Sequence, residues 1–230
     1  MFLFVLACAA REPTLSTAPP MVQQPPPSID LGTQWVHRSD AHQAVLATIY
    51  QNAGEALAVR AQALEPDTAW AIVSDVDETL VDNSEYQIQT LGQFSPETWA
   101  VWEEQGQAVA YAGAVALVAG VHDQGGRMAF VTNRSNHPAT LALLQAQGLW
   151  AEGDVLCVRT ESSDKSARRQ SVLEGGALCG WPGEPVQVLG YWGDQMGDFP
   201  VVAQDDPSIQ ESWGETWFML PNPMYGSWAE

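Results

Sequence analysis

The sequence has few basic residues: 9 Lys and Arg stand against 28 Asp and Glu in 230 residues, for a net charge of −19 at pH 7. Nucleic acids bind basic surfaces that neutralise their phosphates, so this balance argues against a nucleic acid polymer as partner. The same charge repels anionic small molecules at long range. An anionic ligand therefore needs a cation at its own site, and a bound metal ion is one source of it.

Cysteine is scarce as well. The three cysteines, Cys8, Cys157 and Cys179, form no CxxC pair, which excludes a zinc ribbon and a disulfide-dense scaffold. The four histidines lack the spacing of metal ligands. If the protein is exported, Cys157 and Cys179 lie in an oxidising compartment and can form a disulfide, although no sequence feature shows that they are close.

The apolar run at the start of the sequence falls far short of the ~20 residues that a membrane-spanning helix needs. Residues 1–10, MFLFVLACAA, resemble the hydrophobic part of a secretory signal. They end in a segment similar to a bacterial lipobox, in which Cys8 becomes the lipidated first residue. The alternative is an apolar terminus with a free thiol. We expect an exported protein of the cell envelope, held by a lipid on Cys8 at the outer membrane or in the periplasm.

Residues 11–33 are rich in proline, with Ser, Thr and Gln between the prolines. This composition predicts an extended tether without a packed core. The remaining length suits one domain. We therefore expect a single folded domain over residues 34–230.

Short apolar runs alternate with helical patterns through this domain, which predicts an α/β fold with a parallel sheet. Ser39 is a suitable start for a first helix. The expected strands are residues 70–73, 128–131, 155–158 and 186–189, with a last strand at 217–220. The expected helices between them are residues 96–105, 113–124, 138–147 and 165–173.

Polar residues follow the ends of these strands. Asp75 and Asp77 follow the first strand, Thr132 the second and Asp194 the fourth, while Lys165 opens the helix after the third. In open α/β sheets, ligands bind at the carboxyl edge of the strands. The sequence therefore predicts that these side chains meet in one site.

The residue types in this site suit phosphoryl transfer. Asp75 and Asp77 can supply a nucleophile and a general acid/base. Asp194 is a candidate ligand for Mg²⁺, which prefers carboxylate oxygens and water. Thr132 can hydrogen-bond a phosphoryl oxygen, and Lys165 can stabilise its negative charge.

Four segments resemble the motifs of the haloacid dehalogenase superfamily of phosphatases: residues 75–79, residues 131–134, Lys165, and residues 193–198. The continuation through residues 80–86, the segment 165–169 and the tail 220–228 make the chain similar to class C acid phosphatases. These are bacterial surface lipoproteins that act as 5′-nucleotidases. The resemblance implies a doubly wound parallel sheet of the haloacid dehalogenase type with a helical N-terminal extension.

The resemblance also implies roles for individual residues. Asp75 is then the nucleophile that forms an aspartyl-phosphate, and Asp77 is the acid/base. Mg²⁺ is held by Asp75, the backbone carbonyl of Asp77 and Asp194, while Asp198 orients metal-bound water or Lys165. Thr132 and Lys165 bind the phosphoryl group. Asn133 binds the substrate as well, and Tyr86 and Tyr225 enclose the base of a 5′-nucleotide. A homodimer is a further expectation from the family.

Plainer interpretations stand beside these. Arg168 and Arg169 are expected on the surface, and the Trp99 and Trp102 pair in the core. The site also suits a broad-specificity acid phosphatase without base preference, in which Tyr225 only packs. A rival of another class is a non-catalytic surface lipoprotein that binds a ligand in the same cleft.

Overall fold

A five-stranded parallel sheet forms the centre of the computed structural model, which describes residues 29–200 and 208–227. The strand order is β5-β4-β1-β6-β7, and every neighbouring pair is parallel. The strands are β1 (Trp70–Ser74), β4 (Arg127–Val131), β5 (Val155–Cys157), β6 (Gln187–Gly193) and β7 (Trp217–Met219). The predicted α/β fold is confirmed. The strand order reverses between β1 and β6, which is where such sheets bind ligands.

Both faces of the sheet are covered, which explains why its strands read as continuous apolar runs. Along β1, Trp70 and Ile72 belong to one core, whereas Ala71 and Val73 belong to the other. This alternation follows the two-residue period of a strand.

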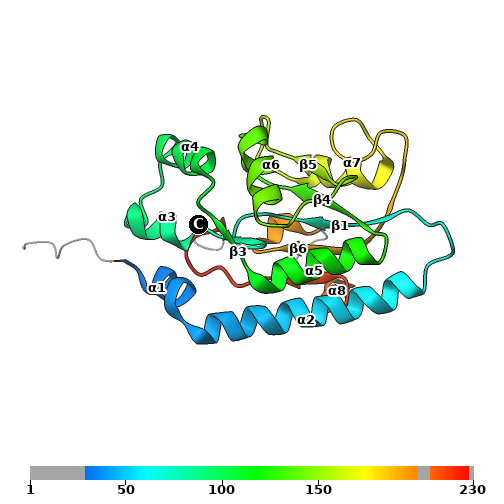
Figure 1. Cartoon of the computed structure of the whole chain (residues 1–230), viewed down its shortest axis with the longest axis horizontal. Helices are drawn as coiled ribbons and strands as arrows, with labels where there is room; N and C mark the ends of the chain where they lie inside the picture. The colour runs from blue at the N-terminus through cyan, green and yellow to red at the C-terminus, as the bar shows by residue number, and fades with distance from the viewer. Residues whose placement is uncertain (1–28, 201–207, 228–230) are drawn as a thin grey trace, which may run out of the picture.

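Helices cover the two faces unequally (Figure 1). The first core receives α2 (Asp40–Gln62), α5 (Ala112–Asp123) and α6 (His137–Ala146), and the long α2 runs beside α5. The second core receives α7 (Ser166–Glu174) and α8 (Ser208–Ser212) through Val172 and Ile209. The expected layers of a doubly wound fold are therefore present.

The helix boundaries follow local capping chemistry. Ser39 accepts hydrogen bonds from the N–H groups of Ala41 and His42 and so begins α2, as predicted. Ser95 caps α4 (Pro96–Gln105), which spans the residues that the sequence predicted, and Gly106 ends it in a left-handed conformation. Hydroxyl caps and glycine ends of this kind are legible in a sequence, which explains the agreement.

The folded part begins earlier than the tether boundary that we predicted at residue 33. Helix α1 (Leu31–Arg38) is capped by Asp30, whose carboxylate accepts hydrogen bonds from the backbone and the hydroxyl of Thr33. A side chain at Gly32 would meet the carbonyl oxygen of Pro223 at 2.3 Å, so α1 packs closely on the C-terminal segment. The expected signal and lipobox with Cys8, and the tether up to residue 28, lie outside the described residues.

A segment of four short elements lies between β1 and α5, and we call it the insertion. The sequence predicted only one of these elements, the helix α4. The insertion also contains β2 (Val81–Asp82), α3 (Ser84–Gln89) and β3 (Val109–Ala110), and β2 pairs with β3 in a separate antiparallel sheet. Strands of two residues are too short to leave a periodic signal, so the sequence did not reveal them. In Figure 1, α3 and α4 lie beyond one end of the central sheet.

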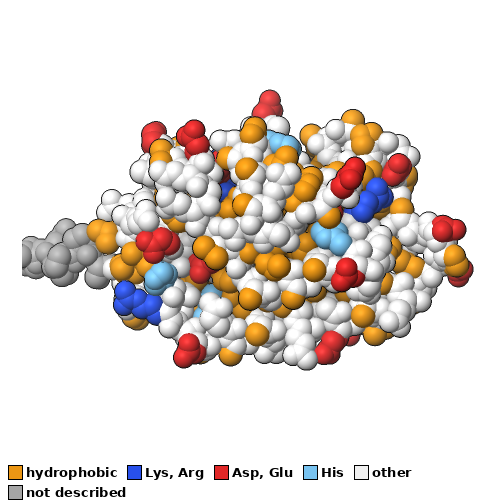
Figure 2. All heavy atoms as spheres, in the orientation of Figure 1, with side chains coloured by type: hydrophobic (Ala, Val, Ile, Leu, Met, Phe, Trp, Pro, Cys, Tyr) orange, Lys and Arg blue, Asp and Glu red, His pale blue; other side chains and the backbone are white. Residues whose placement is uncertain are grey.

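Acidic side chains are scattered over the face drawn in Figure 2 and form no single cluster there. This distribution suits solubility better than one large cationic partner. Among the described residues, no helix has both the length and the apolar content that a bilayer crossing requires.

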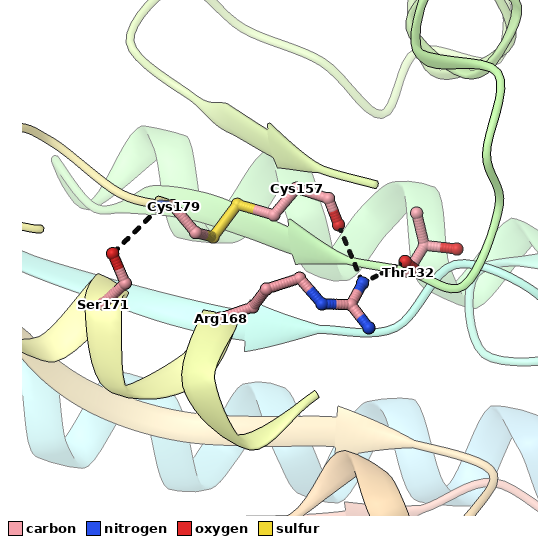
Figure 3. The surroundings of a disulfide bond; sticks show 5 residues. All are labelled: Thr132, Cys157, Arg168, Ser171 and Cys179. Carbon is pink, nitrogen blue, oxygen red and sulfur yellow. Dashed lines mark hydrogen bonds between the residues drawn. A yellow bond between two sulfur atoms is a disulfide. The ribbon is translucent and has the colours of Figure 1, made fainter. Parts of the chain in front are cut away.

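A disulfide joins Cys157, at the end of β5, to Cys179 in the loop after α7 (Figure 3). The two Cα atoms are 5.6 Å apart, and both side chains are buried. The backbone N–H of Cys179 donates to the hydroxyl of Ser171 in α7. The pairing that the sequence left open is therefore present, and it fastens α7 to the edge of the sheet.

Replacement of both cysteines by serine is expected to lower the free energy of unfolding. A crosslink across 22 residues restricts the unfolded chain, and a loop of this length is worth about 3 kcal/mol. Urea unfolding of Cys157→Ser/Cys179→Ser beside the oxidised wild type measures the difference. A reducing agent should lower the midpoint of the wild type and leave the double variant unchanged; equal midpoints for all samples would contradict the expectation.

Candidate active site

A cavity of about 730 Å³ opens at the carboxyl ends of β1, β4 and β6. The predicted residues Asp75, Asp77, Asn133, Lys165, Asp194, Asp198 and Tyr225 line it. The insertion contributes Gln87, Gly92, Phe94 and Trp99 to the wall, and the C-terminal segment contributes Met224 and Gly226. Chain segments far apart in the sequence thus build one site.

Lys165 lies between two carboxylates at the base of this site. Its Nζ is 2.6 Å from Oδ1 of Asp75 and 2.5 Å from Oδ1 of Asp198. Burial disfavours the charged ammonium, but Asp75 and Asp198 outweigh burial and raise the pKa of Lys165. Lys165 is therefore a permanent positive charge beside Asp75.

Three buried carboxylates gather around this lysine. Oxygen atoms of Asp75, Asp194 and Asp198 all lie within 4.8 Å of one another. Burial raises the pKa of Asp75 well above its usual range; Lys165 opposes the rise, while Asp198 and Asp194 add to it. Burial, followed by the charge of Asp198, raises the pKa of Asp194 to about 6. Crowded, desolvated carboxylates of this kind favour a bound cation.

The donor set fits a divalent metal ion. One lysine balances one of the three negative charges, which leaves an excess of negative charge at a buried place. Carboxylate oxygens are the ligands that hard divalent cations prefer. Asp75, Asp194 and Asp198 can therefore hold such an ion.

The turn after β6 places Asp194 and Asp198. A side chain at Gly193 would come within 2.2 Å of Cβ of Asp198, so glycine permits the close packing of this turn. Asp198 ends the short 3₁₀ helix η1 (Met196–Asp198), and its Oδ2 accepts from the N–H of Gln195. Gln195 and Asn222 both donate to Oδ2 of Asp194. The prediction did not assign these two amides, although Asn222 belongs to the tail that carried the resemblance.

Asp77 lies apart from the three carboxylates. Its Oδ1 accepts hydrogen bonds from the side chains of Arg134 and Asn83. The resemblance implied a metal contact through the backbone carbonyl of Asp77, which leaves this carboxylate free for acid/base work. Arg134 belongs to the motif at residues 131–134, but the sequence analysis gave it no role.

Thr132 and Asn133 follow β4, as predicted. Thr132 is fully buried; its N–H donates to the carbonyl of Cys157, and its Oγ1 accepts from the N–H of Arg134. Asn133 lines the cavity, and its Oδ1 accepts from Arg168 at 2.7 Å. Asn133 is thus the more accessible of the two.

Arg168 and Arg169 correct the expectation that they lie on the surface, because they are 6% and 4% exposed. Arg168 donates to the backbone carbonyls of Thr132 and Cys157 (Figure 3). Arg169 donates to the carbonyl of Gly197. Spacings of three and four residues from Lys165 place both arginines on the helix face that carries the site, and this spacing was the available signal.

The aromatic residues require a second correction. Tyr86, predicted to contact the base, is 2% exposed and is not among the residues that line the cavity. Its ring packs against Trp99 and Trp102, and its hydroxyl bonds that of Thr98. Trp102 is buried as expected, but Trp99 lines the cavity. The position of α4 puts Trp99 where Tyr86 was expected.

Stabilisation of the protein by a divalent cation is expected to grow from pH 5 to pH 7. Because the pKa of Asp194 in the folded protein is about 6, against an ordinary value of about 3.9, the folded state binds a proton more tightly than the unfolded state. The cation-free protein therefore loses stability as pH rises from about 4 to 6, and a cation must displace that proton below pH 6.

Melting temperatures with millimolar Mg²⁺ or with EDTA, at pH 5 and pH 7, measure this effect. Asp194→Asn should abolish the difference between the two pH values. An equal shift at both pH values in the wild type would contradict the expectation.

Comparisons with known proteins show the fold and the family of the chain. The fold is similar to that of the class C acid phosphatase from Bacillus anthracis with tungstate bound, with a TM-score of 0.73 and 24% identity over 86% of this chain and 84% of that one. A second structure of that phosphatase also has a TM-score of 0.73, at 23% identity over the same shares. A sequence profile described as HAD superfamily, subfamily IIIB (acid phosphatase), matches residues 16–228. Since this match spans most of the chain, the protein belongs to subfamily IIIB of the HAD superfamily, the acid phosphatases.

Proposed function

We propose that this acid phosphatase depends on Mg²⁺ and hydrolyses 5′-nucleotides through an aspartyl-phosphate on Asp75. The composition of the cavity supports the proposal above all. The cavity contains Asp75 with its Lys165 partner, and its wall carries the aromatic side chains Phe94, Trp99 and Tyr225. A phosphate site next to aromatic rings suits a phosphomonoester with a planar leaving group.

In the first chemical step, a carboxylate oxygen of Asp75 attacks phosphorus, and the bond from phosphorus to the ester oxygen breaks. Asp77 gives its proton to the departing oxygen, so that the nucleoside leaves as an alcohol. Lys165 supplies a fixed positive charge beside the nucleophile. When bound at the three carboxylates, Mg²⁺ supplies further charge that neutralises the phosphoryl oxygens.

In the second step, water attacks the aspartyl-phosphate. Asp77, now a carboxylate, takes the proton of that water, and the bond between phosphorus and Asp75 breaks. Inorganic phosphate leaves, and both aspartates return to their starting states. Asn133, which Arg168 holds at the cavity wall, is placed to donate to a phosphoryl oxygen.

The aromatic side chains of the cavity wall can bind the base of the nucleotide. Trp99 is held from three sides: its Nε1 donates to Glu103 at 3.0 Å, Tyr86 packs edge-on against its ring, and Phe94 lies beside it. A ring fixed in this way loses little freedom when a base stacks on it. We assign base recognition to Trp99 and Tyr225 in place of the Tyr86 and Tyr225 pair.

The location in the cell is part of the proposal. A disulfide between Cys157 and Cys179 suits an oxidising compartment, as export would provide. A lipid on Cys8 and a Pro-rich spacer would hold the enzyme at the cell envelope. The enzyme would then meet nucleotides outside the cytoplasm.

Asp75→Asn is expected to reduce phosphate release from 5′-AMP to the background of the assay, because an amide cannot form the aspartyl-phosphate. EDTA should reduce the wild-type rate, and Mg²⁺ should restore it. The exposed carboxylate of Asp123, in α5, provides a control: Asp123→Asn should keep wild-type activity. A fully active Asp75→Asn enzyme would overturn the mechanism.

Trp99→Leu and Tyr225→Ala are each expected to lower kcat/KM for 5′-AMP relative to p-nitrophenyl phosphate. Stacking on an aromatic side chain is worth about 1–3 kcal/mol per base, so the ratio should fall by roughly 5- to 150-fold. Tyr86→Phe keeps the buried ring and should leave the ratio unchanged. If neither Trp99→Leu nor Tyr225→Ala alters the ratio, the enzyme is a broad-specificity phosphatase.

A further inference from the structure

The buried guanidinium of Arg134 makes two contacts with one carboxylate oxygen of Asp77. Its Nη2 lies 2.8 Å and its Nε 2.9 Å from Oδ1 of Asp77, and its side chain is 1% exposed. Burial disfavours this charge, but Asp77 outweighs burial and the pKa of Arg134 is raised. Burial of an arginine costs free energy unless its charge is paired, so the contact with Asp77 is a necessary part of this site.

Asn83 donates to the same oxygen. Its Nδ2 is 2.9 Å from Oδ1 of Asp77. The Oδ1 of Asn83 accepts from Trp102 at 2.8 Å and from Nη2 of Arg134 at 3.2 Å. Because two N–H donors point at this amide oxygen, its nitrogen must face Asp77, and the orientation of Asn83 is fixed.

The two oxygens of Asp77 are therefore unequal. Oδ1 accepts hydrogen bonds from Nε of Arg134 and Nδ2 of Asn83, and Nη2 of Arg134 lies 2.8 Å from the same atom, so no room is left for a proton there. Within residues 29–200 and 208–227, Oδ2 receives no hydrogen bond, and Asp77 lines the cavity. The proton that Asp77 exchanges must consequently sit on Oδ2.

We infer that Arg134 and Asn83 are positioning residues that hold Asp77 by Oδ1, so that Oδ2 delivers the proton to the leaving oxygen. This inference rests on the proposed role of Asp77 as general acid. The proton passes from Oδ2 to the ester oxygen as its bond to phosphorus breaks, and Asp77 is left as a carboxylate. The planar fork of an arginine sets this orientation, whereas the ammonium of a lysine offers no such plane.

The same contacts join the general acid to the insertion. Trp102 comes from α4, and Trp99 of that helix has its ring centroid 5.5 Å from the guanidinium carbon of Arg134. Glu103, also in α4, accepts from Trp99 and from the N–H of Ser135, next to Arg134. Helix α4 thus contacts both the aromatic wall of the cavity and the residues that hold Asp77.

The test compares two esters of similar size, p-nitrophenyl phosphate and benzyl phosphate. Nitrophenolate leaves readily without a proton, whereas benzyl alcohol needs one, so loss of general acid catalysis slows benzyl phosphate selectively. The quantity measured is kcat/KM, which reports the steps through formation of the aspartyl-phosphate and so excludes its hydrolysis. Asp77→Asn sets the reference and should lower the benzyl rate by about 10²–10⁴-fold.

Arg134→Gln and Arg134→Lys should each lower kcat/KM for benzyl phosphate by about 10–100-fold, part of the full general-acid effect, and change the nitrophenyl rate little. Asn83→Ala should act in the same direction more weakly, and it carries the test if the Arg134 variants do not fold. In an Asp77→Asn background, Arg134→Lys should cause no further selective loss. Arg168→Lys is the matched control, because this buried arginine does not touch Asp77 and should slow both esters equally.

Far-UV circular dichroism and melting temperature establish that each variant is folded. A folded Arg134 or Asn83 variant that slows both esters by the same factor, or slows neither, would overturn the inference. If Asp77→Asn itself shows no preference for the better leaving group, the proposed role of Asp77 fails instead.

Discussion

The active site depends on the ion contacts of Lys165 with Asp75 and Asp198. Burial disfavours the charge of Lys165, these carboxylates stabilise it and raise its pKa, and Lys165 in turn offsets the repulsion between them. The contacts join the turn after β1, the start of α7 and the turn after β6. The remaining negative charge of Asp75, Asp194 and Asp198 favours a bound cation, and these three carboxylates could hold one.

Basic residues are concentrated where this chemistry occurs. In a chain with only 9 Lys and Arg, five of them belong to the site: Arg134, Arg159, Lys165, Arg168 and Arg169. Arg168 and Arg169 hold backbone carbonyls of the neighbouring loops, so they act on the shape of the site. Four of these five residues are buried and Arg159 is exposed. They give an otherwise acidic chain a local positive charge at the site.

The sequence predicted the sheet and the gathering of polar side chains at its carboxyl edge well, because both leave local signals. The strands are short apolar runs, and Asp75, Thr132, Lys165 and Asp194 stand where those runs end. The insertion was largely missed, since β2 and β3 are short and their pairing depends on distant residues. Tyr86 shows the same limit: its residue type suggested a base contact, but the packing of α4 decides that Trp99 reaches the cavity. The contact of Arg134 with Asp77 joins positions far apart in sequence and has no local pattern.

The central position of β1 has a consequence for how the enzyme is assembled. Trp70 pairs with Gln187, and the N–H of Asp75 donates to the carbonyl of Trp192, so Asp75 is held by a strand far along the chain. Such long-range pairings form slowly, because a large loop must close before they contribute. A nascent chain that has not yet produced β6 therefore carries Asp75 and Asp77 without the hydrogen bond and the acidic turn that complete the site. Catalytic competence arrives with the last third of the polypeptide.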